Sequence, residues 1–409
     1  MRERLRPLLL FLAIVGPGII TANVDNDAGG ITTYSLAGAQ FGYAFLWTLI
    51  PITVALIVVQ EMCARMGAVT GKGLADLIRE HFGVKMTFFL MVGLLFADLG
   101  NTCAEFSGVA ASGEIFGVSK YLTVPLGALF VWWLAVRHSY RRVEKTFLVA
   151  CVFYVSYIIS GMYVHPNWGA VLRSTVVPNV SLNAGWIGML IGVVGTTIAP
   201  WMQFYLQAAV VDKGVTVRDY AYSRIDVIVG CVITDVVAFF IIFTTGATIF
   251  ANHLQVKDAA DAAVALRPFA HGYCTHLFAF GLLNAGLFAA SILPLATAYY
   301  ICEGMGWPRG LDLAFRDAPQ FYGLYTALVV IGAGIVLIPN APLLAIMFIS
   351  QVVNGILLPF VLIYMLVLIN NAALMGRYRN SRTFNTIAWA TVVVMNVLTL
   401  ALVVTSFIH

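Results

Sequence analysis

The residues of this chain that could do chemistry lie inside apolar segments. Asp25 and Asp27 flank Asn26 in the first such segment, just before Gly29 and Gly30. Two carboxylates beside unwound backbone carbonyls form a hard oxygen site that suits Mg²⁺, Ca²⁺ or Mn²⁺. The alternative is that an aspartate caps the N-terminus of a following half-helix. Because a spacing of two points the side chains in different directions, we expect Asp27 to be the ligand and favour capping for Asp25.

A second group of polar residues follows one face of the third apolar segment. Asp98, Asn101 and Glu105 stand at i, i+3 and i+7, which places them on one side of a helix. Such a stripe predicts a water-filled pathway, and the alternative is buried hydrogen bonding between helices. Glu61 precedes Arg65 by four residues, which predicts an ion pair along one helix.

Three further polar residues lie deep in apolar segments. Asp235 has no visible partner in the sequence, and a functional and a structural role are equally open. Gln351 and Asn354 stand three residues apart, where hydrogen bonding between helices is the default and pathway lining the alternative. Charges in these segments need a reason, because each costs about 2.5–3.5 kcal/mol or more at the centre of a bilayer.

Helix-breaking residues interrupt two of the apolar segments. The first reads Asp-Asn-Asp-Ala-Gly-Gly over residues 25–30, and the other reads Gly-Thr-Thr-Ile-Ala-Pro over residues 195–200. Glycine lowers helix propensity, and Pro200 removes a backbone donor and clashes with the preceding turn. Paired interruptions at corresponding positions indicate a transport site at the interface of two inverted repeats. The alternative for Pro200 alone is a simple kink.

The positioning elements must be membrane-spanning helices. Hydrophobic residues make up 61% of the 409 positions and charged residues 10%, and the mean hydropathy is +0.91. A soluble domain has roughly 25% charged residues, so the composition predicts an all-α integral membrane protein. We expect about eleven spans: 8–40, 45–60, one opening at residue 86, 121–136, 146–164, 186–211, 227–251, 277–302, 321–338, 343–369 and 387–408.

The distribution of positive charge supports this count and orients the chain. With a cytoplasmic N-terminus, 19 of the 23 Lys and Arg residues fall in cytoplasmic segments, which the positive-inside rule favours. The C-terminus is then extracytoplasmic. We expect one transporter domain over residues 1–409, with helices 1–5 at about 8–164, helices 6–10 at about 186–369 and helix 11 at about 387–408.

The sequence argues against several other classes of protein. The net charge of +4 follows from orientation and implies no nucleic-acid partner. The chain has neither an HExxH nor a GxSxG pattern, so we expect no enzyme activity. Its six cysteines lack CxxC spacing, which predicts buried free thiols. An organic-solute carrier of the same architecture remains an alternative, although such carriers seldom place an acidic residue at the site.

Short motifs along nearly the whole chain resemble one family. They are Gly16-Pro17-Gly18, Asp27-Ala-Gly-Gly30, Phe41-Gly42-Tyr43, Ala64-Arg65-Met-Gly67, Thr70-Gly71, Asp98-Leu99, Ser350-Gln351-Val352-Val353, Leu358-Pro359-Phe360 and Met375-Gly376. Together they resemble the natural-resistance-associated macrophage protein (Nramp) family of divalent-metal transporters. The resemblance implies a LeuT-like 5+5 inverted repeat with broken helices 1 and 6.

The resemblance also implies where the transported ion binds. Asp27 keeps the ligand aspartate of the family's Asp-Pro-Gly-Asn motif, Thr196 keeps a backbone carbonyl ligand, and Gln351 matches a glutamine near the ion. The family's asparagine ligand is Gly30 here, and its methionine ligand is Ala199.

Two further departures from the family concern protons. The histidine that follows the proline is Trp201, and the family's Asp-x-x-Glu proton relay reads Asp98-x-x-Asn101. With Asp25 and Glu105, these three residues are expected along the pathway or around the ligands. Loss of an ionisable His and Glu removes groups that could carry coupled protons.

These departures predict a change in ion preference. A thioether favours transition metals, so its loss removes discrimination against hard cations, and Mg²⁺ suits a site with few protein ligands because it keeps its waters. The pattern resembles the Nramp-related magnesium transporters, which implies uptake of Mg²⁺, and also of Mn²⁺, without proton coupling. The alternative is a proton-coupled Mn²⁺/Fe²⁺ symporter. We expect a multi-pass protein of the plasma (inner) membrane that needs no cofactor and acts as a monomer in the lipid bilayer.

Overall fold

The chain folds as a bundle of long helices, and the described residues contain no strand. The computed structural model describes residues 24–137, 158, 167–256, 261, 273–311 and 313–408. Long apolar runs form helices because a helix satisfies its own backbone groups where water is absent. The longer helices are α4 (Leu46–Thr70), α5 (Leu74–Ile115), α6 (Lys120–Arg137), α12 (Tyr220–Thr245), α15 (Tyr273–Met305), α16 (Pro319–Val336), α17 (Leu343–Asn370) and α19 (Arg382–Ile408).

The other described elements are shorter. They are η1 (Val24–Asn26), α3 (Ala28–Phe41), α9 (Trp168–Val176), α10 (Ala184–Thr197), α11 (Pro200–Asp212), η3 (Gly246–Phe250), α18 (Ala372–Met375) and η4 (Gly376–Tyr378). The 42-residue α5 is bent at Gly83, whose φ of 82° is one that residues with a side chain rarely adopt.

The observed helices confirm the all-helical membrane class. Eight helical stretches in the described residues are long and apolar enough to cross a bilayer, and Lys120–Val136 is a shorter apolar helix. The predicted span over 146–164 and the first part of the span over 8–40 lie outside the described residues. The total of eleven spans therefore stays a prediction.

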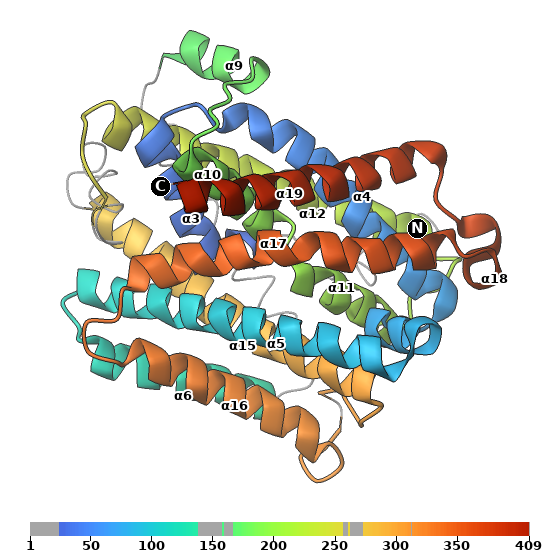
Figure 1. Ribbon diagram of the computed structural model, residues 1–409. Coiled ribbons are helices and arrows are strands. Elements are labelled where there is room, and N and C mark those ends of the chain that lie inside the picture. The colour runs from blue at the N-terminus through green and yellow to red at the C-terminus, as the bar shows by residue number, and fades with distance from the viewer. Residues whose placement is uncertain are drawn as a thin grey trace, which may run out of the picture.

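The core of the bundle is built on α5. Helices α15 and α17 pack along it, α17 also packs on α10, and α12 packs on α3 and α4. Figure 1 shows α5 beside α15, with α6 and α16 together at one edge of the bundle. Glycines allow the closest crossings: a Cβ on Gly195 of α10 would overlap the backbone of Gln351 and Gly355 on α17. The four described cysteines, Cys63, Cys103, Cys231 and Cys302, are buried and free, as predicted.

Two helical courses are interrupted near the centre of the bundle. η1 ends at Asn26, Asp27 is extended with a ψ of −178°, and α3 begins at Ala28. α10 ends at Thr197, Ile198 and Ala199 leave the helical region, and Pro200 starts α11. Pro200 lies at the second of these places, whereas Gly29 and Gly30, expected to break the first segment, are helical within α3; the assignment to broken helices of an inverted repeat stays a prediction.

Ion pairs join the helices at one end of the bundle. Asp76 near the start of α5 pairs with Arg79 at 3.3 Å and with Arg309, beyond the end of α15, at 2.9 Å. Arg309 also lies 3.6 Å from the buried carboxylate of Glu303. The predicted ion pair between Glu61 and Arg65 is present at 3.1 Å.

Candidate functional site

Asp27 caps the helix that follows the first interruption. Its Oδ1 accepts a hydrogen bond of 2.6 Å from the backbone N–H of Gly30, while the residue itself is 4% exposed. The extended backbone of Asp27 allows this bond, because an N-cap residue must leave the helical region. The capping alternative for Asp27 is therefore observed. It occupies Oδ1 once and leaves the carboxylate with further acceptor capacity.

Glu105 of α5 brings a second carboxylate to the same helix terminus. Its Oε2 accepts a hydrogen bond of 3.0 Å from the backbone N–H of Ala28, and the side chain is fully buried. Its Oε1 is buried with no hydrogen-bond donor among the described residues. Asp27 and Glu105 lie close enough to interact directly. Two ionised carboxylates offer acceptors only, so a cation or a proton is needed between them.

Asp98 and Asn101, on the same face of α5, join a different set of partners. Oδ2 of Asp98 accepts hydrogen bonds from Thr297 Oγ1 at 2.7 Å and from the Tyr300 hydroxyl at 2.9 Å. Its Oδ1 accepts from Asn101 Nδ2 at 3.0 Å. The expected stripe is thus divided: Glu105 contacts α3, whereas the other two contact α15 and α17. For Asp98 and Asn101, the hydrogen-bonding alternative describes the structure.

Three amides continue this network toward the first interruption. Asn101 and Asn354 exchange two hydrogen bonds of 3.1 and 3.0 Å, and Asn354 Nδ2 also donates to Gln351 Oε1 at 3.0 Å. Gln351 Nε2 donates to Ser350 Oγ at 3.2 Å. A Cβ on Gly29 would overlap Gln351 Nε2 and stand 3.3 Å from Asp27 Oδ1. The Gln351 amide therefore lies beside the carboxylate of Asp27.

The second interruption lies near the same glutamine, because Gly195 packs against the backbone of Gln351. Pro200 has no N–H and therefore cannot donate the helical hydrogen bond to the carbonyl of Thr196. The buried Gln203 satisfies the next carbonyls, with its amide nitrogen 2.7 Å from Ala199 O and 2.6 Å from Pro200 O in the orientation that pairs donor with acceptor. The Tyr34 hydroxyl of α3 lies 2.7 Å from Oγ1 of Thr197, the last residue of α10. This contact joins α3 to α10.

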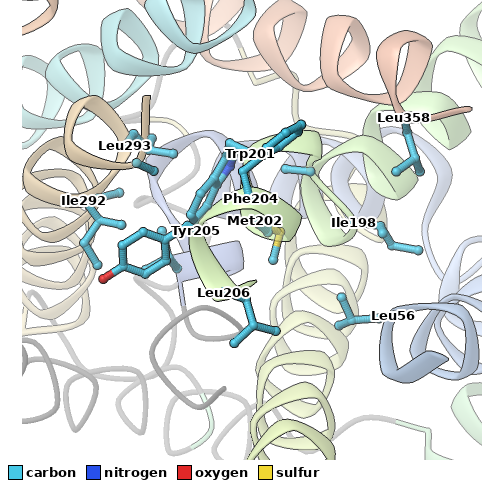
Figure 2. Packing of buried hydrophobic residues seen from close by; sticks show 14 of the residues in the cluster. Leu56, Ile198, Trp201, Met202, Phe204, Tyr205, Leu206, Ile292, Leu293 and Leu358 are labelled. Atoms are coloured by element: carbon cyan, nitrogen blue, oxygen red, sulfur yellow. The ribbon is translucent and has the colours of Figure 1, made fainter. Parts of the chain in front are cut away.

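The remaining predicted site residues have distinct surroundings. Ala199 and Trp201 are each 2% exposed. Figure 2 shows Trp201 among apolar side chains, with Met202 and Phe204 on the same half-helix. Trp201 therefore packs in the hydrophobic core, and its expected place along the pathway or around the ligands stays a prediction. The side chain of Asp25 lies outside the described part of the structure.

Asp235 does not join this site. It is buried beside Thr53, at a contact between α12 and α4. Both carboxylate oxygens of Asp235 are buried without a hydrogen-bond donor among the described residues, so the functional and the structural alternative both stay open.

A cavity of about 670 Å³ lies beside the end of α3. Its lining includes Gln40, Glu114 and Lys120. A smaller pocket shares Leu36, Val256 and Leu344 with the cavity. That pocket reaches Thr32, which lies little more than one turn beyond Asp27. The ion-paired cluster at Asp76 stands at the other end of α5.

Several members of the site were missed by sequence reasoning. Thr297 and Tyr300 hold Asp98, and Ser350 accepts from Gln351. Threonine and tyrosine are common in apolar helices, so only their i, i+3 spacing could have drawn attention to α15. The described residues contain no group of three His, Cys, Asp or Glu side chains arranged around one point. The carboxylate oxygens of Asp27 and Glu105 are ligands that suit hard cations.

Comparison with known proteins connects this chain to one family. The family described as natural resistance-associated macrophage protein-like matches residues 18–405. The divalent metal cation transporter MntH of Klebsiella pneumoniae is 27% identical over 393 residues, which cover 94% of this chain and 92% of that protein.

Two solved structures share the fold. The Eremococcus coleocola manganese transporter, in complex with an aromatic bis-isothiourea compound, superposes with a TM-score of 0.77 at 22% identity, covering 95% of this chain and 85% of that chain. MhsT in complex with L-phenylalanine has a TM-score of 0.62 at 14% identity, covering 95% and 98%. At these identities the two structures support the fold alone.

Proposed function

Because the chain belongs to the Nramp family, whose members are transporters and not enzymes, we propose that it carries divalent metal cations across a membrane. The observation that carries this proposal is the pairing of Asp27 and Glu105 at the first interruption. Both carboxylates are buried, and a divalent cation beside them would neutralise their charge. We place the Thr196 carbonyl, from the end of α10, beside these carboxylates as a further oxygen ligand, with the Gln351 amide of α17 next to Asp27.

The proposed binding set follows from these contacts. Asp27 is the central ligand, with the Thr196 carbonyl and Gln351 nearby, and Gly30 and Ala199 stand where larger side chains would reach the ion. Asp98 and Asn101 hold the Gln351 side chain in place through hydrogen bonds that run by way of Asn354. Glu105 is the second charge of the site.

For the ion itself, the named relatives support manganese as one substrate. The relatives above are named for divalent metal cations and for manganese, and these names favour the Mn²⁺ alternative over the magnesium preference predicted from the sequence. Their names say nothing of magnesium. A magnesium preference without proton coupling is a second candidate, supported by Gly30, Ala199 and the uncharged Asn101, which leave the ion fewer ligands and the site fewer titratable groups.

The proposed topology follows the distribution of positive charge. We place the N-terminus and the Asp76 cluster in the cytoplasm and the 670 Å³ cavity on the outer face. The two interruptions then correspond to broken helices 1 and 6 of a LeuT-like 5+5 repeat with eleven helices in one domain, residues 1–409. The proposed location is the plasma (inner) membrane, and the proposed working unit is a monomer.

The test is metal flux into liposomes containing the purified protein. Wild-type protein should give saturable Mn²⁺ uptake, and Asp27→Ala should abolish it while the protein stays folded in detergent. Asp219→Ala, a change in a loop far from the site along the chain, is the matched control. Near wild-type uptake by Asp27→Ala would remove the site, and absence of Mn²⁺ and Mg²⁺ uptake by the wild-type protein would remove the function.

A further inference from the structure

The hydrogen bonds around Gln351 have a definite direction. Its Oε1 accepts from Asn354, which turns its Nε2 toward Ser350 and Gly29. A nitrogen that carries hydrogens cannot coordinate a cation, because amide ligands bind metals through their oxygen. In the observed arrangement Gln351 thus presents its donor end to the carboxylate of Asp27.

This direction is set at Asp98. From there a series of hydrogen-bonded side chains, here called the amide chain, runs through Asn101 and Asn354 to Gln351. The Asp98 carboxylate can only accept, and its Oδ1 takes the hydrogen bond from Asn101 Nδ2. Asn101 Oδ1 must then accept from Asn354 Nδ2, which also supplies the hydrogen bond to Gln351 Oε1. Turning the Gln351 amide alone would place two N–H groups against each other. Turning all three amides would place Asn101 Oδ1 against the Asp98 carboxylate.

All four side chains of the amide chain are buried. Asp98, Asn101, Gln351 and Asn354 are each 1% exposed. A buried polar atom that loses its partner is not compensated by water, so a mismatched amide would be costly. The amide chain is therefore a stiff support and not a loose set of contacts.

We propose that Asn354 is a positioning residue that selects the ion: it holds Gln351 with its amide nitrogen toward the site and so keeps the Gln351 oxygen from entering the coordination shell. This inference rests on the proposed function. With the oxygen withheld, the ion binds with more of its own water. That arrangement favours Mg²⁺, which gives up water reluctantly, over Mn²⁺, which accepts protein ligands more readily.

Release of the Gln351 amide should therefore favour manganese. In Asn354→Ala the hydrogen bond to Oε1 is lost, the amide can turn, and the KM for Mn²⁺ should fall relative to that for Mg²⁺ by roughly three- to tenfold, the worth of about one hydrogen bond. Asn354→Asp should act in the same direction, because a carboxylate at this position attracts the Gln351 N–H groups and turns the oxygen toward the ion. Asn101→Ala removes the hydrogen bond to Asp98 that fixes the direction of the amides. We expect the same fall in the KM for Mn²⁺ relative to that for Mg²⁺.

The decisive experiment is a double-mutant cycle on liposome flux, with Mn²⁺ and Mg²⁺ as the probes. The Mn²⁺/Mg²⁺ ratio of KM values is measured for wild type, Asn354→Ala, Gln351→Ala and the double variant. If Asn354 acts through Gln351, its effect on the ratio disappears in the Gln351→Ala background. Asn370→Ala, at the other end of α17, is the control and should leave the ratio unchanged.

The outcomes separate this inference from the function on which it rests. An unchanged ratio in Asn354→Ala, Asn354→Asp and Asn101→Ala, or an equal shift with and without Gln351, overturns the positioning role while the transport function stands. A wild-type protein that carries neither ion overturns both. Should Asn354→Ala fail to fold, Asn354→Asp and Asn101→Ala decide the question.

Discussion

The backbone N–H of Ala28 donates a hydrogen bond of 3.0 Å to Oε2 of Glu105, which places a second carboxylate at the helix terminus that Asp27 caps. Helix N-termini carry partial positive charge and so stabilise both acids. The terminus cannot neutralise two full charges, and the remaining negative charge makes the site attractive to a divalent cation.

Glu105→Gln should weaken ion binding without damaging the fold. Glutamine can still accept from Ala28 and can donate to Asp27, while one negative charge is lost. We expect the KM for Mn²⁺ to rise at least about tenfold, which corresponds to 1.4 kcal/mol, and the melting temperature of the metal-free protein to stay level or rise. Flux and thermal unfolding measure the two effects. Glu80→Gln, in an exposed ion pair with Lys72, is the control, and an unchanged KM would remove Glu105 from the site.

Gly195→Ala should destabilise the protein through the crossing of α10 and α17. A Cβ at this position would overlap the backbone of Gln351 and Gly355, and overpacking of this kind costs about 1–3 kcal/mol or more. A lower melting temperature in detergent is expected. At Gly334 of α16 a Cβ would meet nothing within 4 Å, so Gly334→Ala is the matched control. Equal melting temperatures for the two variants would contradict the crossing.

Restoring the family's side chains at the two interruptions should shift the ion preference. Gly30→Asn combined with Ala199→Met supplies an amide oxygen and a thioether, and the thioether favours transition metals. We expect a higher Mn²⁺/Mg²⁺ flux ratio in the double variant than in either single variant. Liposome uptake of each ion alone is the measurement. A ratio that stays at the wild-type value in a folded double variant would place selectivity elsewhere.

Metal uptake should proceed without movement of protons, if the magnesium candidate holds. Asn101 and Trp201 cannot titrate, so neither can carry a proton together with the ion. Flux should therefore depend little on pH between roughly 6 and 8, above the ordinary range of carboxylates.

Internal pH of the liposomes is the measurement for this prediction, with the membrane potential clamped during Mg²⁺ or Mn²⁺ influx. No metal-dependent acidification is expected. A saturable acid signal that disappears in Asp98→Asn would instead establish a proton symporter.

Composition and local pattern were enough to predict the all-helical membrane class. Water is absent from a bilayer core, so a long apolar run must be a helix, and its length follows from the thickness to be crossed. Pro200 lies where α11 begins, because proline acts on the backbone locally, whereas Gly29 and Gly30 did not stop α3, since packing can override the low helix propensity of glycine. The Glu61–Arg65 ion pair was likewise predictable, since both ends belong to one helix.

The partners of the polar residues depended on tertiary structure. Asp98, Asn101 and Glu105 look equivalent on one helix face, yet Glu105 contacts α3, while Asp98 and Asn101 contact α15 and α17. Periodicity gives the face of a helix, but it does not say which neighbour packs on each turn of that face. The direction of the amide chain from Asp98 to Gln351 follows only when four side chains from two helices meet out of water, because each donor must then find an acceptor.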